Sequence, residues 1–530
     1  MHRSKVHRRA ALATATVALA LTAAVTGAPA QGATATGPLQ LISPGDPYAS
    51  CDLSGDGPGV SSPSAEAEPY AAADPRDPHR AITVYQQDRW SNGGARGLSS
   101  SYTTNGRDFV QTPLPFTHCA PGGLPYQRAS DGWVSFGPDG TAYSSALVFD
   151  ATDANNGVAA ATSYDGGRTW QHVTQLIRDT DPAFGDDKNS VTADPVHAGT
   201  AYQVWDRLDQ TTSPARYNGP SYLSVTRDGG RTWGPAHPFV DTSGVPNTQT
   251  IGNVIVVDPR TDTLYDFFQW LTYTDATGNT VAETHFAFVS STDQGRSWTA
   301  PTTIVADTAV NEVDPNAPAD PDKALRAGAG LPSAAIDPAT GELYLAYEGS
   351  DFSAGQFDSI ELVHSTDGGH SWSGPVRVNQ APNAPAFTPS IAVDRQGTVS
   401  ISYYDLRYLT PTDTTTLPGA AWLLSFPRGR EDAAVERQIS PVFDWLQAPN
   451  AGGHFLGDYQ SLITDGPRVR PVLVTANDDP QDSTDVYTGL FDPRSLRSTP
   501  ATLAPATGRP APAGPHGTSS TSGTPGRPLR

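Results

Sequence analysis

The chain has 530 residues, of which 34 are lysine or arginine and 55 are aspartate or glutamate, giving a formal net charge of -21 at pH 7. So acidic a surface excludes nucleic acid and anionic membranes as expected partners, because both bind proteins through clustered basic side chains. The length alone suggests several domains, but the repeats described below predict one continuous repeat region.

Residues 1–30 have the pattern of a signal peptide. Four basic residues between Arg3 and Arg9 precede the apolar run ALATATVALALTAAV, and the small residues APA follow at 28–30. This run is too short, and too interrupted by threonine, for a membrane-spanning helix, which needs about 20 apolar residues. We therefore expect a secreted, extracellular protein without membrane insertion. Its mature form would carry 30 basic against 55 acidic residues, a net charge of about -25.

An N-terminal segment, residues 31–65, precedes the repeats. Its only strand-like run, LQLIS at 39–43, is a candidate for a strand that closes a ring of sheets, because an open sheet edge invites association. Asp52, Ser54 and Asp56 are spaced as in the first half of a calcium-binding loop. No glutamate stands at the twelfth position, so we expect no metal there.

Cys51 and Cys119 are the only cysteines. An even pair in an exported chain favours a disulfide over a metal or redox site, and the chain has no CxxC motif. We expect a bond between Cys51 and Cys119 that ties the N-terminal segment to a loop of the repeat region.

An eight-residue phrase recurs four times, as SYDGGRTW at 163–170, TRDGGRTW at 226–233, STDQGRSW at 291–298 and STDGGHSW at 365–372. The spacings between these copies are 63, 65 and 74 residues, and a degenerate copy, YTTNGRDF, occupies 102–109. Each copy follows a strand-like stretch, and Asp-x-Gly is turn chemistry. We therefore expect a hairpin turn whose aspartate accepts backbone N–H groups and whose tryptophan fills the gap between neighbouring sheets. The residues with these structural roles are Asp165, Trp170, Asp228, Trp233, Asp293, Trp298, Asp367 and Trp372.

A second phrase recurs along the same region: an apolar strand, a DP- or DG-type turn and an alternating strand. Its seven copies begin with AAADPRDPHRAITVYQQDRW and end with SLITDGPRVRPVLVTAND. They predict seven four-stranded antiparallel sheets, that is, an all-β propeller over residues 66–497. Residues 498–530 are rich in proline, serine, threonine and glycine with almost no apolar side chain, so we expect a disordered tail.

The eight-residue phrase is the Asp box, and the stretch 68–493 resembles the propellers of bacterial sialidases and other BNR-repeat proteins. The resemblance implies a sialidase-like exo-glycosidase that removes terminal sugars from extracellular glycans. The segment GDYQSLITDG at 457–466 resembles the Tyr-Ser-x-Leu segment of the last sialidase blade. The Arg-Ile-Pro phrase that supplies the first sialidase arginine is absent. Sialidases have six blades, so six is the alternative to seven.

In such a propeller, the connections before the inner strands share one face with the ends of the second strands, and the Asp boxes lie on the other face. Inward carboxylates beside arginines make the first face a candidate glycan site, because glycoside hydrolysis needs a proton donor and a nucleophile across one bond. Residues before the inner strands are Glu68, Asp131, Asp187, Lys188, Gln249, Thr388, Asp458 and Tyr459. Residues at the ends of the second strands are Asp88, Arg89, Asp206, Arg207, Glu348, Asp405 and Arg407.

The resemblance to sialidases implies a substrate-binding set on this face. Arg89, Arg207 and Arg407 would converge on a substrate carboxylate, with Asp187 beside them, since guanidinium groups bind carboxylates bidentately. The alternative is that each Asp-Arg pair forms a salt bridge between neighbouring sheets.

The resemblance also implies a catalytic set. Tyr459 would be the nucleophile, because a neutral phenol is not repelled by the carboxylate of sialic acid. Glu68 would activate it, and Asp131 would be the general acid and base. The alternative for Glu68 is a capping role or a place in a water-lined channel.

Other chemistries have little support in the sequence. No HExxH motif or paired histidines indicate zinc, and no GxSxG motif indicates a serine hydrolase, so we expect neither a metal nor a cofactor. Two other functions stay open. One is a non-catalytic propeller that binds a glycan or a protein partner, and the other is a different Asp-box glycoside hydrolase acting on a polysaccharide.

Overall fold

The structure is a computed structural model that describes residues 39–210, 218–274 and 280–495. The expected signal peptide (1–30) and tail (498–530) lie outside the described residues. Those that are described are all-β, with 3-10 helices of three residues but no α-helix. None of their helices has the length and apolarity needed to cross a membrane.

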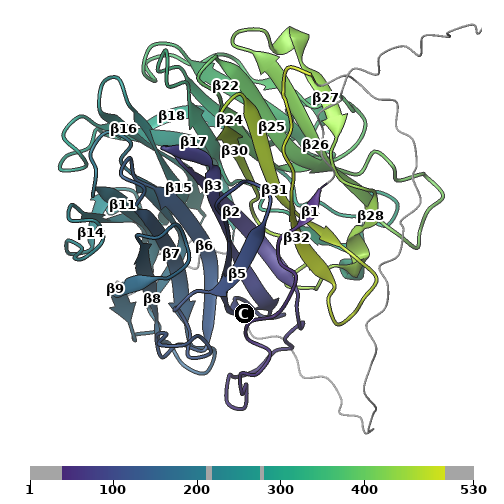
Figure 1. The fold of residues 1–530 in the computed structure, drawn as a ribbon. Coiled ribbons are helices and arrows are strands. Elements are labelled where there is room, and N and C mark those ends of the chain that lie inside the picture. The colour runs from purple at the N-terminus through teal and green to yellow at the C-terminus, as the bar shows by residue number, and fades with distance from the viewer. Residues whose placement is uncertain (1–38, 211–217, 275–279, 496–530) are drawn as a thin grey trace, which may run out of the picture. The chain divides into compact units, whose positions relative to one another are not determined.

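Consecutive strands pair antiparallel in groups of four, and each group is called a sheet here and named after its first strand; Figure 1 shows their arrangement. The β2 sheet consists of β2 (Glu66–Asp74), β3 (Asp77–Arg89), β4 (Ala95–Thr103) and β5 (Phe109–Pro113). The β6 sheet consists of β6 (Arg128–Phe136), β7 (Ala142–Phe149), β8 (Asn156–Ser163) and β9 (Gln171–Asp179). The β10 sheet consists of β10 (Phe184–Ala193), β11 (Ala201–Asp209), β13 (Ser221–Thr226) and β14 (His237–Val240).

The pattern continues along the rest of the chain. The β15 sheet consists of β15 (Thr248–Asp258), β16 (Thr263–Tyr273), β17 (Val281–Ser291) and β18 (Thr302–Ala306). The β20 sheet consists of β20 (Ser333–Ile336), β21 (Leu343–Gly349), β22 (Ser359–Ser365) and β23 (Val376–Arg377). The β24 sheet consists of β24 (Ala386–Val393), β25 (Thr398–Asp405), β26 (Pro418–Pro427) and β27 (Val435–Gln438). The β30 sheet consists of β30 (Ser461–Asp465), β31 (Arg468–Ala476), β32 (Thr484–Thr488) and β1 (Gln40–Leu41).

The first strands of these sheets form a closed ring. β2 contacts β6, β6 contacts β10, and the contacts continue through β15, β20 and β24 to β30, which contacts β2. Apolar faces meet between neighbouring sheets, as where Phe267 and Phe286 of the β15 sheet pack against Leu343 and Tyr347 of the β20 sheet. This arrangement is that of a β-propeller, in agreement with the prediction from the repeats.

The N-terminal strand closes the ring. β1 pairs antiparallel with β32, so the purple start of the chain lies beside the yellow end (Figure 1). Ser43 donates to the Glu66 carboxylate at 2.9 Å, and Thr484 donates to the Glu66 carbonyl at 2.8 Å. Both ends of the described chain are thereby attached to the β2 sheet.

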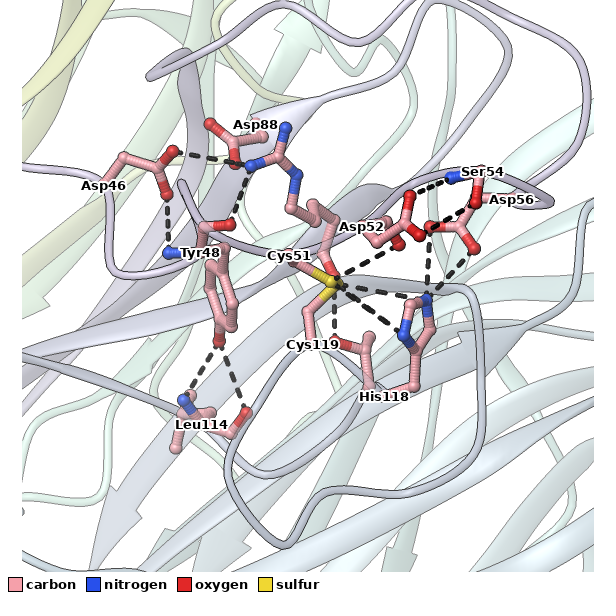
Figure 2. Close-up of a disulfide and its surroundings, with 12 residues drawn as sticks. Asp46, Tyr48, Cys51, Asp52, Ser54, Asp56, Asp88, Leu114, His118 and Cys119 are labelled. Carbon is pink, nitrogen blue, oxygen red and sulfur yellow. Dashed lines mark hydrogen bonds and ion pairs between the residues drawn. A yellow bond between two sulfur atoms is a disulfide. The ribbon is translucent and has the colours of Figure 1, made fainter.

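The segment after β1 is fastened to the β2 sheet by a disulfide and a buried tyrosine (Figure 2). Cys51 and Cys119 are bonded, with Cα atoms 5.4 Å apart, which confirms the predicted pairing. The Tyr48 side chain is buried, where its hydroxyl donates to the Leu98 carbonyl and accepts from the Leu114 N–H at 3.2 Å.

Short elements occupy the connections. They are β12 (Asn218–Gly219), β19 (Leu325–Arg326), β28 (Phe443–Asp444), β29 (His454–Phe455), η1 (Pro321–Lys323), η2 (Asp351–Ser353), η3 (Glu431–Ala433) and η4 (Trp445–Gln447). A pairing of β4 with β6 joins the β2 and β6 sheets, and the short strand β12, which pairs with β11 and in parallel with β15, joins the β10 and β15 sheets. β19 and β29 pair in parallel, which brings the long connection between β18 and β20 next to the connection that precedes β30. This pair lies at the end of the ring where the first strands begin.

Candidate functional site

Within the described residues, five first strands share one irregularity. The pairing of β2, β6, β10, β15 and β24 with the following strand skips two residues. A bulge of this kind re-aims side chains, and a left-handed backbone at a residue other than glycine costs on the order of 1–3 kcal/mol, so its repetition points to a function. The first skipped residue is left-handed in every case: Glu68 (φ 52°), Asp131 (50°), Lys188 (44°), Gly252 (74°) and Thr388 (54°).

Three of these bulges bring charged side chains together around one lysine. Lys188 Nζ lies 2.6 Å from Asp458 Oδ2, 3.4 Å from Asp131 Oδ1 and 3.6 Å from Glu68 Oε1. Asp458 comes from the connection before β30, and its N–H donates to Glu68 Oε1 at 3.2 Å. All three carboxylates are buried. These four residues are called the Lys188 cluster below.

Two arginines border the Lys188 cluster. Arg326 Nε donates to Asp458 Oδ1 at 2.9 Å, and its Nη2 donates to Oδ2. Arg89 is buried and donates from Nη1 to Gln86 Oε1 at 2.7 Å. Both guanidinium groups lie 4.5 Å from the ring centre of Phe455. The three carboxylates of the cluster therefore face three cations.

Burial and the surrounding charges push the pKa values of these carboxyl groups apart. Burial raises the pKa of Glu68 to about 7, although the charge of Lys188 opposes the rise. Burial acts on Asp458 as well, but Lys188 and Arg326 outweigh it and hold the pKa of Asp458 well below its usual range. At neutral pH one carboxyl group thus exchanges protons readily while another stays ionised. Such a division is typical of acid–base sites.

Tyr459 lies next to the cluster and is held by other contacts. Its hydroxyl donates to the Gly132 carbonyl at 3.4 Å, and its ring packs edge-on against Trp133 with the ring centres 5.2 Å apart. Burial, reinforced by the negative charge of Glu68, raises the pKa of Tyr459 well above its usual value. Glu68, its expected activator, accepts hydrogen bonds from a glutamine side chain of β3 and from the Asp458 N–H.

A pocket of about 400 Å³ opens beside the cluster. Two smaller cavities, of about 60 and 40 Å³, are lined by Tyr459. Ligand sites typically measure about 300–1,000 Å³, so of the three cavities that Asp458 or Tyr459 lines, the pocket of about 400 Å³ alone falls in this range. Its wall includes Asn311, Glu312, Arg326, Gly328, Gly452 and Asp458.

The structure does not bring the three expected arginines together. Arg207 makes two bonds of 2.8 Å with Asp179 of β9, so this pair joins the β6 and β10 sheets. Arg407 binds Glu436 of its own sheet at 2.6 Å. Of the three arginines, Arg89 alone lies beside the Lys188 cluster. For Arg207 the structure shows the alternative interpretation, a salt bridge between neighbouring sheets.

Asp187 lies at the β10 bulge rather than in the pocket wall. Its carboxylate accepts the N–H of Lys188 at 2.9 Å, which holds the bulge in place. Arg326 and Glu312 were not singled out in the sequence. They belong to the connection between β18 and β20, which matches no repeat. The length of this connection was the only sign of a functional role in the sequence. Long connections in a fold whose other strands are joined by short turns are usually functional.

The Asp boxes lie at the other end of the strands. The Gly229 N–H of one box donates to Gly199 in the turn between β10 and β11 at 2.9 Å. Each box aspartate accepts a backbone N–H at 2.9 Å, from Thr169, Thr232, Ser297 and Ser371. The tryptophans contact the preceding sheet, in the pairs Trp170–Ser100, Trp233–Tyr143, Trp298–Phe239 and Trp372–Phe267.

No protein-family model matches the sequence, and neither does any curated protein sequence. Solved structures do show similarity. The chain is similar to a Penicillium chrysogenum alpha-L-arabinanase complexed with arabinobiose, at 10% identity over 83% of this chain and 98% of that one, with a TM-score of 0.46. It is also similar to a Hadza microbial sialidase (13% identity, 79% and 77% covered, TM-score 0.43). A third similar structure is a protein of unknown function from Dyadobacter fermentans (12% identity, 83% and 99% covered, TM-score 0.45).

Proposed function

We propose that the protein is a secreted glycoside hydrolase that cleaves extracellular glycans in the pocket beside the Lys188 cluster. One observation carries this proposal. Glu68, with a pKa of about 7, and Asp458, with a pKa far below its usual range, lie in one cluster next to a pocket of about 400 Å³. Glycoside hydrolysis needs both a carboxylic acid and an ionised carboxylate near the scissile bond, and the pocket volume lies in the range of ligand sites.

The proposal includes a scaffold of seven blades and export from the cell. Seven blades are supported by the ring that β2, β6, β10, β15, β20, β24 and β30 form in the described part of the chain. Export is supported by the signal-peptide pattern and by the Cys51–Cys119 bond, since disulfides persist in oxidising compartments.

Asp458 is the carboxylate of the Lys188 cluster that faces the sugar, because it lines the pocket. The sialidase-type assignment is a narrower version, with Tyr459 as nucleophile, Glu68 as its activator and Asp131 as acid and base. That version requires a sugar to reach Tyr459, whose cavities measure about 60 and 40 Å³. It therefore requires these cavities to widen, and Leu331 and Pro332 are the residues of the connection between β18 and β20 that line both of them.

The test is turnover of fluorogenic sialosides and neutral glycosides by the mature protein, residues 31–530. We expect hydrolysis that is lost in Asp458→Asn and kept in Asp465→Asn. Asp465 is the matched control because it is also buried and paired with an arginine, Arg470, but lies at the far end of β30.

Two further measurements separate the alternatives. Near wild-type turnover in Tyr459→Phe would exclude the narrower, sialidase-type version. Binding to an array of immobilised glycans without turnover would make the protein a glycan-binding propeller. The absence of both turnover and binding for every glycan in the two assays would contradict the proposal and point to a protein partner.

A further inference from the structure

Glu312 is a second carboxylate in the wall of the pocket that Asp458 lines. It is 4% exposed and lies on the connection between β18 and β20. Its carbonyl accepts the Leu325 N–H at 3.0 Å, and the adjacent Val313 forms a bridge with Ala324. The connection is thereby folded back on itself, and the Glu312 side chain has a fixed place in the pocket wall.

The surroundings of Glu312 favour its protonated form. Its Oε1 accepts the Asp358 N–H at 2.9 Å, and the Asp358 carboxylate accepts the Val310 N–H at 3.0 and 3.1 Å. Burial, together with the negative charge of Asp358, raises the pKa of Glu312 well above its usual value. No cationic side chain among the described residues pairs with either carboxylate. Nearby Glu348 is also buried, and its Oε2 has no hydrogen-bond partner there.

Glu68 does not line this pocket, whereas Glu312 does. Resting on the proposed function, we propose that Glu312, in place of Glu68, is the proton donor of the hydrolase and that the pocket holds a neutral sugar between Glu312 and Asp458. Glu312 has the geometry that this role requires. One of its oxygens is held by a backbone N–H, and the other, Oε2, has no hydrogen-bond partner among the described residues. It shares a pocket wall with an ion-paired carboxylate, so acid and anion are available to the same substrate.

The reaction balances with water as the second reactant. Glu312 gives its proton to the glycosidic oxygen while the bond from the anomeric carbon to that oxygen breaks. The electron pair stays on the oxygen, and an alcohol leaves. The positive charge on the anomeric carbon is stabilised by the Asp458 carboxylate. Water then adds to that carbon and returns a proton to Glu312, so one glycoside and one water give two hydroxyl compounds.

The charges around the pocket favour a neutral sugar over a sialic acid. Arg326 is the cation in the pocket wall, but it already gives two hydrogen bonds to Asp458 and a third, at 3.3 Å, to the Ala451 carbonyl. Lys188 is shared by three carboxylates. A sugar carboxylate would therefore enter the pocket without a cation of its own, next to Asp458 and Glu312.

The test compares Glu312→Gln with the wild type on two neutral glycosides that differ in their leaving group. On a disaccharide, whose alcohol leaves only with a proton, kcat should fall by about 100- to 10,000-fold. On a 2,4-dinitrophenyl glycoside, whose phenol leaves unprotonated, kcat should fall by less than about tenfold. The alkaline limb of the pH–rate profile should also disappear.

Glu342→Gln is the matched control. Glu342 is 5% exposed, as buried as Glu312, but lies in the turn between β20 and β21 at the Asp-box end. It should keep wild-type rates on both substrates. Thermal melts establish that each variant is folded. Should Glu312→Gln not fold, Glu312→Asp draws the acid back from the pocket and should show the same dependence on the leaving group.

The outcomes separate this inference from the proposed function. Wild-type kcat in folded Glu312→Gln, or equal losses on both glycosides, would overturn the role of Glu312 while turnover by the wild type upholds the hydrolase. Turnover of sialosides alone would overturn the neutral sugar. If the wild type hydrolyses no glycoside, the proposed function fails, and the role of Glu312 fails with it.

Discussion

Lys188 is the residue on which the electrostatics of the site depend. Its ammonium group has three buried carboxylates within 3.6 Å, and its backbone is left-handed, which is uncommon for any residue other than glycine. Moving a charge out of water costs several kcal/mol, and only well-placed partners offset this cost. Although burial opposes it, the charges of Asp131 and Asp458 hold the pKa of Lys188 well above its usual value.

Lys188→Met should lower the free energy of unfolding by about 3–5 kcal/mol at pH 7.5, since it leaves buried carboxylates without their shared cation. The loss should shrink at pH 5, because Glu68, with a folded-state pKa of about 7, is then protonated. Urea denaturation at both pH values measures the difference. Arg430→Met removes only the exposed pair with Asp432 and should leave the midpoint unchanged. An equal loss at both pH values would contradict this account.

Hairpins carrying the four Asp boxes pack the β6, β10, β15 and β20 sheets against the sheet before each of them. Trp233 is half-buried against Tyr143, so Trp233→Ala should cost about 2–3 kcal/mol, less than the 3–5 kcal/mol of a fully buried aromatic residue. Asp228→Ala should cost less, since it removes the acceptor for Thr232. Melting temperatures measure both changes. Activity per folded molecule should be unaffected, and lost activity at an unchanged melting temperature would contradict a purely structural role.

The disulfide fastens the N-terminal segment to a loop of the β2 sheet. The two cysteines are 68 residues apart, and the loop-entropy model gives about 4 kcal/mol for a crosslink of this span. The double variant Cys51→Ser, Cys119→Ser should therefore unfold at a lower denaturant concentration than the oxidised wild type. Equilibrium denaturation measures the shift, and equal midpoints would show that the bond contributes nothing.

Strand geometry explains why Arg89 lies beside the Lys188 cluster while Arg207 lies in a salt bridge between sheets. Arg89 and Arg207 occupy equivalent repeat positions, each after an aspartate. Asp88 has φ 63°, which breaks the alternation of side chains just before Arg89. Asp206 instead lies within β11 and accepts the Gly252 N–H of the next sheet at 2.9 Å, which leaves Arg207 on the opposite face. One sequence cannot reveal this difference, because the preceding residue is aspartate in both repeats.

For the whole molecule, the sequence repeats are what allowed the fold to be predicted. Each repeat carries its own turn residues and alternation, so the order of the strands and the Asp-box hairpins followed from local patterns. Glu68 and Asp131, expected just before the inner strands, lie inside β2 and β6, at the bulges that no local pattern predicted. The pocket wall did not follow from local patterns either, because Glu312 and Arg326 lie on a connection that occurs once. Their positions depend on the pairing of β19 with β29, which involves residues more than 120 positions apart and leaves no local pattern.

Buried carboxyl groups should make the stability of the whole molecule depend on pH. In the unfolded chain such groups titrate near pH 4, so between about pH 4 and pH 7 the folded state binds more protons than the unfolded state. The free energy of unfolding should fall as the pH rises through this window, and the melting temperature at pH 5 should exceed that at pH 7.5. A melting temperature that rises from pH 5 to pH 7.5 would contradict this expectation. Burial raises the pKa to about 7 for Glu68, Asp88, Asp186, Asp358, Glu361 and Asp405.

β1 cannot pair with β32 until almost the whole chain has been synthesised. Gln40 faces Thr488 across the β1–β32 ladder, so every other sheet is made before the ring can close. Pairings this distant in sequence form slowly, because a long loop must be ordered first. Until then the outer edge of β32 is open to another chain. Refolding from denaturant should therefore end in a slow step, with a yield that falls as the protein concentration rises.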